Sequence, residues 1–161
     1  MPRWRLSLPR PANLRGLRAW THDLLAHGTP REIISFHLLS FRPPDLSLEE
    51  LEATSTIERE VAAIMVERNL LGIELEKAGR IDEAVALYES NLADWFGGNH
   101  PYDRPRVIYS RTGRYRDAIR VCEAFVSMAD ELIALGSPRV DLLPKRETFA
   151  AWVSKLRPKA I

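Results

Sequence analysis

The feature that most constrains this chain is an internal repeat with a period of 34 residues, between about Met65 and Leu132. Shifted by that period, the chain places small residues on identical small residues: Gly79 on Gly113 and Ala84 on Ala118. Thirty-four residues hold a helix, a glycine-centred turn and a second helix, and self-similarity at this period is typical of stacked helical hairpins. We therefore expect an all-α scaffold with repeats at about 65–98 and 99–132.

Apolar spacing, capping residues and glycine stops predict where the helices begin and end. The predicted helices are 13–26, 30–41, 47–53, 56–78, 81–95, 115–135 and 144–156. The predicted starts are Asn13, Thr29 followed by Pro30, and two capping boxes, Ser47 with Glu50 and Ser55 with Glu58. The predicted stops are Gly28, Gly79, Gly97-Gly98, Gly113 and Gly136.

Three segments carry apolar residues that need a partner surface. The long helix should present one stripe, made of Ile57, Val61, Ile64, Leu71 and Leu75, and the last helix another, made of Phe149, Trp152, Val153 and Leu156. The last helix, within about 144–157, departs from the repeat, so we interpret it as a cap over the open end of the stack. Residues 33–41 are apolar on most sides and must be buried, against the repeats or in a partner.

Prolines and charge divide the chain into two parts. Pro43-Pro44 marks the predicted boundary between a basic segment with one or two helices, 1–44, and a helical domain, 45–161. Residues 1–44 carry seven arginines against Asp23 and Glu32, whereas the whole chain has a net charge of only +1. The remainder is therefore acidic, and the two parts could attract each other.

Composition favours a protein of a reducing compartment. The single cysteine, Cys122, cannot form an intrachain disulfide and lies on the apolar side of a helix, so we interpret it as a small buried side chain. No apolar run reaches the length of about 18 residues that a membrane span needs, and the arginine-rich first residues lack the apolar core of a secretory signal. We expect a cytoplasmic protein without a membrane partner.

The repeated pair of units resembles the tetratricopeptide repeat (TPR) family. The segment 70–92 matches its pattern at Leu71, Gly72, Leu75, Gly79, Ala84 and Tyr88, and the segment 101–126 matches it at Tyr109, Gly113, Ala118 and Phe125. The phrase from Asn99 to Val121 is also similar to stretches of bacterial TPR proteins of unassigned function. The resemblance implies a right-handed α-α superhelix, here a short solenoid with flanking N-terminal helices and a C-terminal capping helix.

The second unit departs from the family pattern at the start of its first helix. It has Pro105 where the first unit has Leu71, and Arg106 where the first has Gly72. Either this helix starts late, with Pro105 in its first turn, or it starts at Pro101 and loses a hydrogen bond at Pro105. The late or kinked start is the interpretation that we favour.

The resemblance also implies where a partner would bind. In the family, partners lie on the concave face made by the first helix of each hairpin. Carried over by position, that face consists of Asn69, Ile73, Glu76, Lys77, His100, Asp103, Val107, Ser110 and Arg111. We expect a scaffold or adaptor that binds a peptide or helical segment of another protein, and a homodimer is a further option. Of the family's clamp for a terminal carboxylate only Asn69 is present, so capture of a chaperone tail is disfavoured.

The sequence contains no motif for catalysis or for binding a cofactor or a metal ion. No HExxH, CxxC or phosphate-binding GxxxxGK[ST] occurs, and acidic pairs such as Asp82-Glu83 lie at helix starts, where they favour the helix dipole. We expect neither an enzyme nor a cofactor or metal site. A nucleic-acid-associated factor is the alternative, with Arg3, Arg5, Arg10, Arg15 and Arg18 as its anchor. In a third hypothesis residues 31–41 occupy the groove themselves.

Overall fold

The structure is a computed structural model that describes residues 14–40 and 47–161. Every regular element in these two ranges is a helix, so the described part of the chain is all-α, as expected. Its internal contacts divide it into two compact units, unit 1 (Met1–Val66) and unit 2 (Glu67–Ile161). The boundary predicted at Pro43-Pro44 and the helix start predicted at Asn13 lie outside the described residues.

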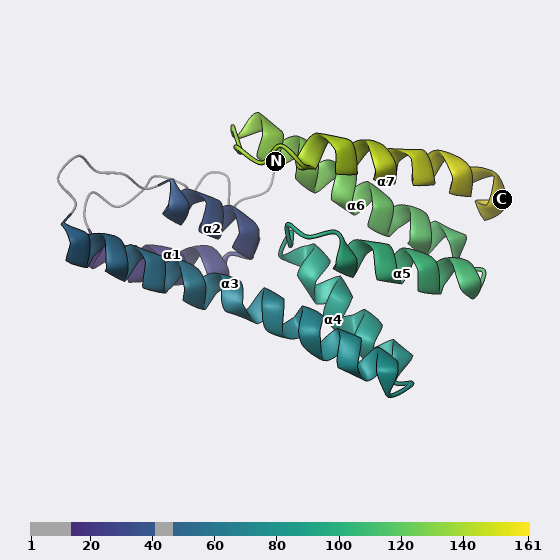
Figure 1. Ribbon diagram of the computed structural model, residues 1–161, viewed down its shortest axis with the longest axis horizontal. Coiled ribbons are helices and arrows are strands. Elements are labelled where there is room, and N and C mark those ends of the chain that lie inside the picture. Colours follow the sequence, from purple (N-terminus) through teal and green to yellow (C-terminus); the bar gives the residue numbers. More distant parts are fainter. Residues whose placement is uncertain (1–13, 41–46) are drawn as a thin grey trace. The chain divides into compact units, whose positions relative to one another are not determined.

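Unit 1 contains α1 (Leu17–Ala26), α2 (Arg31–Leu39) and the first part of α3 (Leu48–Lys77), with a short 3-10 turn at Leu14–Gly16 before α1 (Figure 1). All three helices contribute to one core, formed by Leu17, Leu24, Ile34, Leu38, Ile57 and Val61. The α2 side chains in this core pack on α1 and α3. Ile34 and Leu38 are therefore buried inside unit 1. They need neither the repeats nor a partner protein to cover them, which were the two possibilities expected for residues 33–41.

The start of α2 differs by one residue from its prediction. Its first helical residue is Arg31, and Pro30 takes the N-cap position with an extended backbone (φ −56°, ψ 134°). Thr29 was expected to cap this helix, but no side-chain hydrogen bond caps it. Proline at the N-cap still fits, because its missing N–H would have had no partner inside the helix.

A single helix, α3, runs through residues 48–77, where the sequence predicts two helices. The capping box at its start is confirmed: the Ser47 N–H donates to Glu50 (2.9 Å), and the Glu50 N–H donates to the Ser47 hydroxyl (3.2 Å). The second box is wrong, because Ser55 lies exposed inside the continuous helix. On the predicted stripe of α3, Ile57 and Val61 are buried, but Leu71 is 53% exposed.

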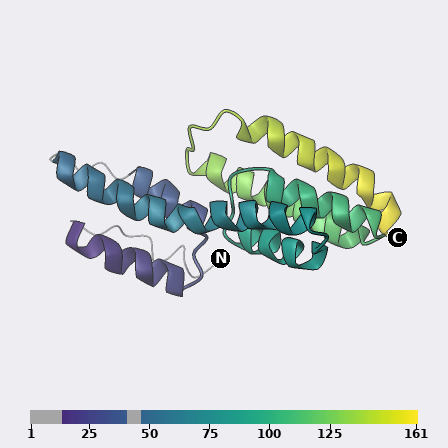
Figure 2. The same ribbon diagram turned by 60° about the horizontal axis from the view of Figure 1, so that its bottom comes forward.

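Unit 2 contains the rest of α3, then α4 (Ile81–Ala93), α5 (His100–Arg111), α6 (Tyr115–Ala134) and α7 (Leu142–Leu156), which ends in a 3-10 turn, Arg157–Ala160. The last three α-helices lie side by side (Figures 1 and 2). Aromatic rings fill the space between them: Phe125 stacks on Phe149 with centroids 4.2 Å apart, and Tyr102 meets Phe125 edge-on at 5.1 Å. The predicted packing stripe of the last helix is confirmed at Phe149, Val153 and Leu156, which are buried.

Left-handed residues end the helices of unit 2 at all four turns, and three of these residues, Gly79, Gly113 and Gly136, are predicted stops. Gly79 (φ +77°) and Gly113 (φ +74°) take the conformation that glycine adopts without strain, and they are one period apart. The end of α4 was predicted at Gly97-Gly98, but the helix ends at Ala93 and the left-handed residue is Trp95 (φ +59°). The Trp95 N–H donates to the Leu92 carbonyl, just as the Gly79 N–H donates to the Glu76 carbonyl (both 3.0 Å).

Close approach in the first hairpin depends on Gly72. A Cβ atom at this position would lie 2.5 Å from the ring of Tyr88, which is completely buried. In the second hairpin the large residue is on the first helix and the small residue on the second, the reverse of the first hairpin. Arg106 takes the position of Gly72, and Cys122 takes that of Tyr88. Burial raises the pKa of Cys122 to about 12, although the nearby charge of Arg106 opposes this rise. The exchange keeps the two helices of the second hairpin packed without a glycine.

The first helix of the second hairpin starts early. It begins at His100, has Pro101 in its first turn and continues through Pro105. The late start is therefore wrong, and the helix follows the other alternative, a start next to Pro101 with Pro105 in its interior. Arg106 is 9% exposed, donates to Asp103 (2.8 and 2.9 Å) and covers the ring of Trp152 at 3.7 Å. This contact ties α5 to α7.

Candidate functional site

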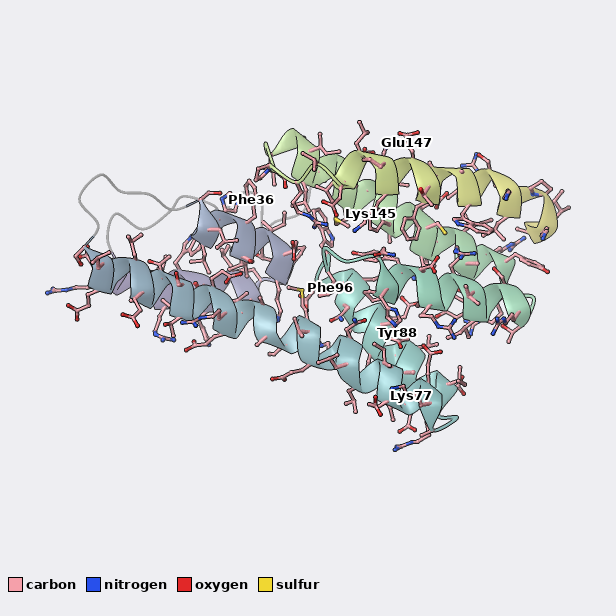
Figure 3. The ribbon with its side chains drawn as sticks, viewed as in Figure 1. Phe36, Lys77, Tyr88, Phe96, Lys145 and Glu147 are labelled. Carbon is pink, nitrogen blue, oxygen red and sulfur yellow. The ribbon has the colours of Figure 1, made fainter. Side chains whose placement is uncertain are left out.

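The candidate site lies in unit 2, on the last turns of α3 and along α5. Of the predicted face residues, Lys77 and Arg111 are exposed, and the other seven are partly buried: Asn69, Ile73, Glu76, His100, Asp103, Val107 and Ser110. Figure 3 labels Lys77, at the carboxyl end of α3, and Tyr88, on the neighbouring α4. The face therefore consists of side chains that are partly held by the protein and partly open to a partner.

An ion pair joins the two helices of this face. The guanidinium of Arg104 on α5 donates through Nε and Nη2 to the carboxylate of Glu76 on α3, at 2.5–3.1 Å. The Glu76 side chain is only 13% exposed and that of Arg104 is 32% exposed. A two-pronged pair with this burial fixes geometry better than a solvated surface pair does. Glu76 and α5 are thus held together.

Tyr88 and His100 complete the network around Glu76. The Tyr88 hydroxyl donates to the same carboxylate at 2.7 Å and lies 3.4 Å from Nε2 of His100. The two rings meet edge-on with centroids 5.4 Å apart. Three helices therefore converge here, with Glu76 from α3, Tyr88 from α4, and His100 and Arg104 from α5.

The protonation states follow from these contacts. The hydrogen bond from Arg104 lowers the pKa of Glu76 despite burial, and burial, with the bond to Glu76, raises the pKa of Tyr88. Burial lowers the pKa of His100, with Glu76 opposing. Near neutral pH the site thus contains a carboxylate, a protonated tyrosine, a neutral imidazole and a guanidinium. Because Glu76 already accepts several hydrogen bonds, this network orients groups and is poorly suited to proton transfer.

The same combination of groups recurs at the next helix interface. Glu89 on α4 accepts hydrogen bonds from the Tyr109 hydroxyl on α5 (2.6 Å) and from Arg120 on α6 (2.6 and 3.0 Å). Burial alone would raise the pKa of Glu89, but these two donors together lower it. Burial and the Glu89 bond raise the pKa of Tyr109 to about 12. Each interface thus has one tyrosine and one arginine bound to one carboxylate.

The remaining predicted residues do not all join this network. Lys77 pairs with Glu74 on its own helix (2.9 Å), and Asp103 pairs with Arg106. Oδ1 of Asn69 and Oγ of Ser110 are buried and have no hydrogen-bond partner among the described residues. The structure therefore brings Glu76 and His100 together, whereas Lys77 and Asp103 are engaged elsewhere.

Sequence reasoning missed Arg104, which holds the site together. The available signal was its spacing: Arg104 follows His100 by four residues and precedes Val107 by three, which places all three on one helix face. Its partner on α3 could not be read from the sequence, because that pairing depends on how two helices lie side by side.

The residues of the nucleic-acid alternative lie elsewhere. Arg3, Arg5 and Arg10 are outside the described residues, and Arg15 is exposed. Arg18 pairs with Glu60 at 2.9 Å. This alternative stays a prediction. Over residues 14–40 and 47–161, no helix is long and apolar enough to cross a membrane, and no group of three or more His, Cys, Asp or Glu side chains could hold a metal ion.

Comparison with known proteins adds no relative: no protein-family model matches this chain, and no curated protein or solved structure matches it significantly.

Proposed function

We propose that unit 2 is a TPR-like interaction module, part of a short helical solenoid that binds a peptide or helix of another protein on the face of α3 and α5. The observation that carries the proposal is the Glu76–Arg104 pair. It joins the two helices that the resemblance to the TPR family assigns to the partner face, although they come from successive hairpins. Two neighbouring first helices are the minimum that such a face needs.

The repeat geometry supports the same proposal. The turns at Gly79 and Gly113 and the starts of α4 and α6 are each one period apart. Gly72 allows the close helix contact that the family pattern asks for. These features favour a binding scaffold, although a fold alone does not define a function.

The groups on the face fit a peptide. Nη1 of Arg104 has no hydrogen-bond partner among the described residues, since Nε and Nη2 bind Glu76. Ile73 and Val107 add partly buried apolar surface. Asn69 and Ser110 each keep a buried polar atom without a partner among the described residues, and such atoms are few in native proteins. A segment with apolar side chains and an exposed backbone would match these groups, because its carbonyls could accept from Nη1 of Arg104 and its N–H groups could donate to Oδ1 of Asn69.

The test is a selection of displayed peptides on the intact chain, followed by affinity measurements on two variants. Val107→Arg places a long cation on the proposed face, whereas Val140→Arg is a matched control at a position 91% exposed in the α6–α7 connection. We expect Val107→Arg to weaken binding about tenfold or more, which is at least about 1.4 kcal/mol, and Val140→Arg to leave it unchanged. Selected peptides that bind both variants as well as the original chain would refute the proposed face.

A further inference from the structure

Unit 2 has a hollow of about 330 Å³ between the start of α6 and the 3-10 turn at Arg157–Ala160. This turn packs against α6 near the carboxyl end of the chain (Figure 1). The lining includes three cationic side chains, Arg114, Arg116 and Lys159, one carboxylate, Asp117, and one aromatic ring, Tyr115. None of these residues belongs to the proposed α3–α5 face.

The protein itself does not neutralise the cations of this hollow. Arg116 and Lys159 are exposed, and no carboxylate among the described residues pairs with either of them. The single carboxylate, Asp117, pairs with Arg114 at 2.8 Å and lies 3.5 Å from Arg120. Because two guanidinium groups already share Asp117, the charges of Arg116 and Lys159 are available to an anion from outside.

The hollow combines these cations with an aromatic ring. Tyr115 is the first residue of α6, and its side chain is partly exposed. Nζ of Lys159 lies 5.9 Å from the centroid of the Tyr115 ring, so a cation and a flat π-face are presented together. A ring in this position offers a surface on which another flat group can stack.

We propose that this hollow binds a single-stranded nucleic acid. One base stacks on Tyr115, and neighbouring phosphates pair with Arg116, Lys159 and the exposed guanidinium of Arg114. Phosphates form strong pairs with such cations, and every base has a face that can stack on an aromatic side chain. The site should therefore bind with little preference for sequence, and it does not depend on the peptide face proposed for α3 and α5.

An acidic protein segment fits the hollow less well. Protein partners are held mainly by bulky side chains that fill an apolar pocket. Apart from the ring, the hollow offers only Ala160 and Ile161 as apolar side chains, and Ile161 is fully exposed. A terminal carboxylate at Ile161 would reduce the positive charge of the lining without cancelling it. Phosphates need no apolar floor, so the charge and the ring together favour a nucleic acid.

The experiment measures the fluorescence anisotropy of a labelled oligothymidine of about 12 nucleotides with the intact chain. Each phosphate contact on a single strand adds about −0.7 to the slope of log affinity against log salt concentration. Three contacts therefore predict a slope of about −2, and the affinity should fall about 20-fold between 50 and 200 mM salt.

A double substitution then locates the binding. Arg116→Gln with Lys159→Gln removes the two exposed cations that have no carboxylate partner. We expect this variant to bind about tenfold or more weakly, with a salt slope smaller by about 1.4. The matched control is Arg59→Gln with Lys77→Gln, which removes the same two charges from exposed positions of α3 outside the hollow. It should change the affinity less than about twofold, because salt screens distant charges.

A third variant tests the ring. Tyr115→Leu keeps apolar bulk at this position but removes the π-face, so we expect it to weaken binding about fivefold or more. The salt slope should stay unchanged, since no phosphate contact is lost. Circular dichroism verifies the fold of each variant, and the double substitution at exposed positions decides on the hollow independently of Tyr115→Leu.

Several results would overturn the proposal. The intact chain could fail to bind oligothymidine at 50 mM salt, the double variant could bind as tightly as the original chain or lose no more affinity than its control, or a folded Tyr115→Leu variant could keep the full affinity. Polyglutamate or phosphatidylserine vesicles that bind more tightly than oligothymidine, and lose that binding in the double variant, would also overturn it, in favour of an acidic protein or an anionic membrane.

Discussion

At the scale of single residues, the fit of Gly72 against Tyr88 decides how closely the first hairpin packs. The ring of Tyr88 is completely buried, bonded through its hydroxyl to Glu76 and in edge contact with His100. It cannot retreat from a new side chain without breaking these contacts. The second hairpin avoids the conflict, because its small residue is Cys122, opposite the large Arg106.

We predict that Gly72→Ala destabilises the protein by about 1–3 kcal/mol, because the added Cβ would lie 2.5 Å from the Tyr88 ring. Urea unfolding followed by circular dichroism measures the loss. The same substitution in a Tyr88→Leu background should cost less, since the smaller side chain leaves room. Equal costs in both backgrounds would show that the ring is not the obstacle.

The second residue-scale prediction concerns Glu76 and acid. Its pKa is lowered in the folded state, chiefly by the hydrogen bond from Arg104. The stabilisation is therefore complete above the ordinary pKa of 4.5 and is lost as the pH falls through the folded value. We predict that Glu76→Gln costs about 1–3 kcal/mol near neutral pH and that this cost shrinks as the pH falls below the ordinary pKa of 4.5 and through the lower folded value.

Urea titrations across that pH range measure the effect. The control is Glu74→Gln, which removes the carboxylate of an exposed pair with Lys77 on the same helix as Glu76. Because this pair is solvated, its loss should have little effect at any pH. A Glu76→Gln variant whose acid sensitivity equals that of the original chain would contradict the proposed role of the carboxylate.

At the scale of whole elements, local chemistry predicts the ends of helices better than their continuity. The turns at Gly79 and Gly113 and the capping box at Ser47 depend on neighbouring residues only, and all three are present. Ser55 and Glu58 form the same sequence motif as the capping box at Ser47, but they lie inside α3. There the threonines on either side of Ser55 bond back to carbonyls one turn earlier, a role that sequence cannot distinguish from capping.

Two further features of the elements had no signal in the sequence. Trp95 takes a left-handed conformation that sequence patterns assign to glycine, so the end of α4 was placed too late. The Glu76–Arg104 pair depends on the placement of α5 beside α3, which no local pattern contains. The resemblance to the TPR family therefore implies which helices should form the candidate face, but not the bond between them.

The two serine boxes give a direct prediction for α3. Ser47→Ala removes the hydroxyl that accepts the Glu50 N–H, so it should destabilise the start of the helix by about 1 kcal/mol. Ser55→Ala replaces an exposed residue in the helix interior with a better helix former and should be neutral or slightly stabilising. Hydrogen exchange of the amides in the first two turns of α3 measures both variants. Increased exchange around residue 55 in Ser55→Ala would mean that a helix does start there.

At the scale of the whole molecule, two cores share one helix. Residues 48–66 of α3 complete the core of unit 1 through Ile57 and Val61, and residues 67–77 supply Gly72 and Glu76 to unit 2. The proposed α3–α5 face lies within unit 2. A change in the core of unit 2 should therefore affect this face more than a change in the core of unit 1.

The last prediction tests this division with one substitution in each core. Leu24→Ala removes a side chain whose core neighbours are all in unit 1, and should cost about 2–5 kcal/mol there. Phe125→Ala removes the ring between Tyr102 and Phe149 in unit 2, at about 3–5 kcal/mol. Native-state hydrogen exchange separates the effects, since it reports the opening free energy of each helix. We expect Leu24→Ala to lower the protection of amides from exchange in α1 and α2 and to leave α6 and α7 unchanged. Phe125→Ala should lower protection in α6 and α7 and leave α1 and α2 unchanged. If either variant lowered protection equally in all helices, the chain would unfold as one body.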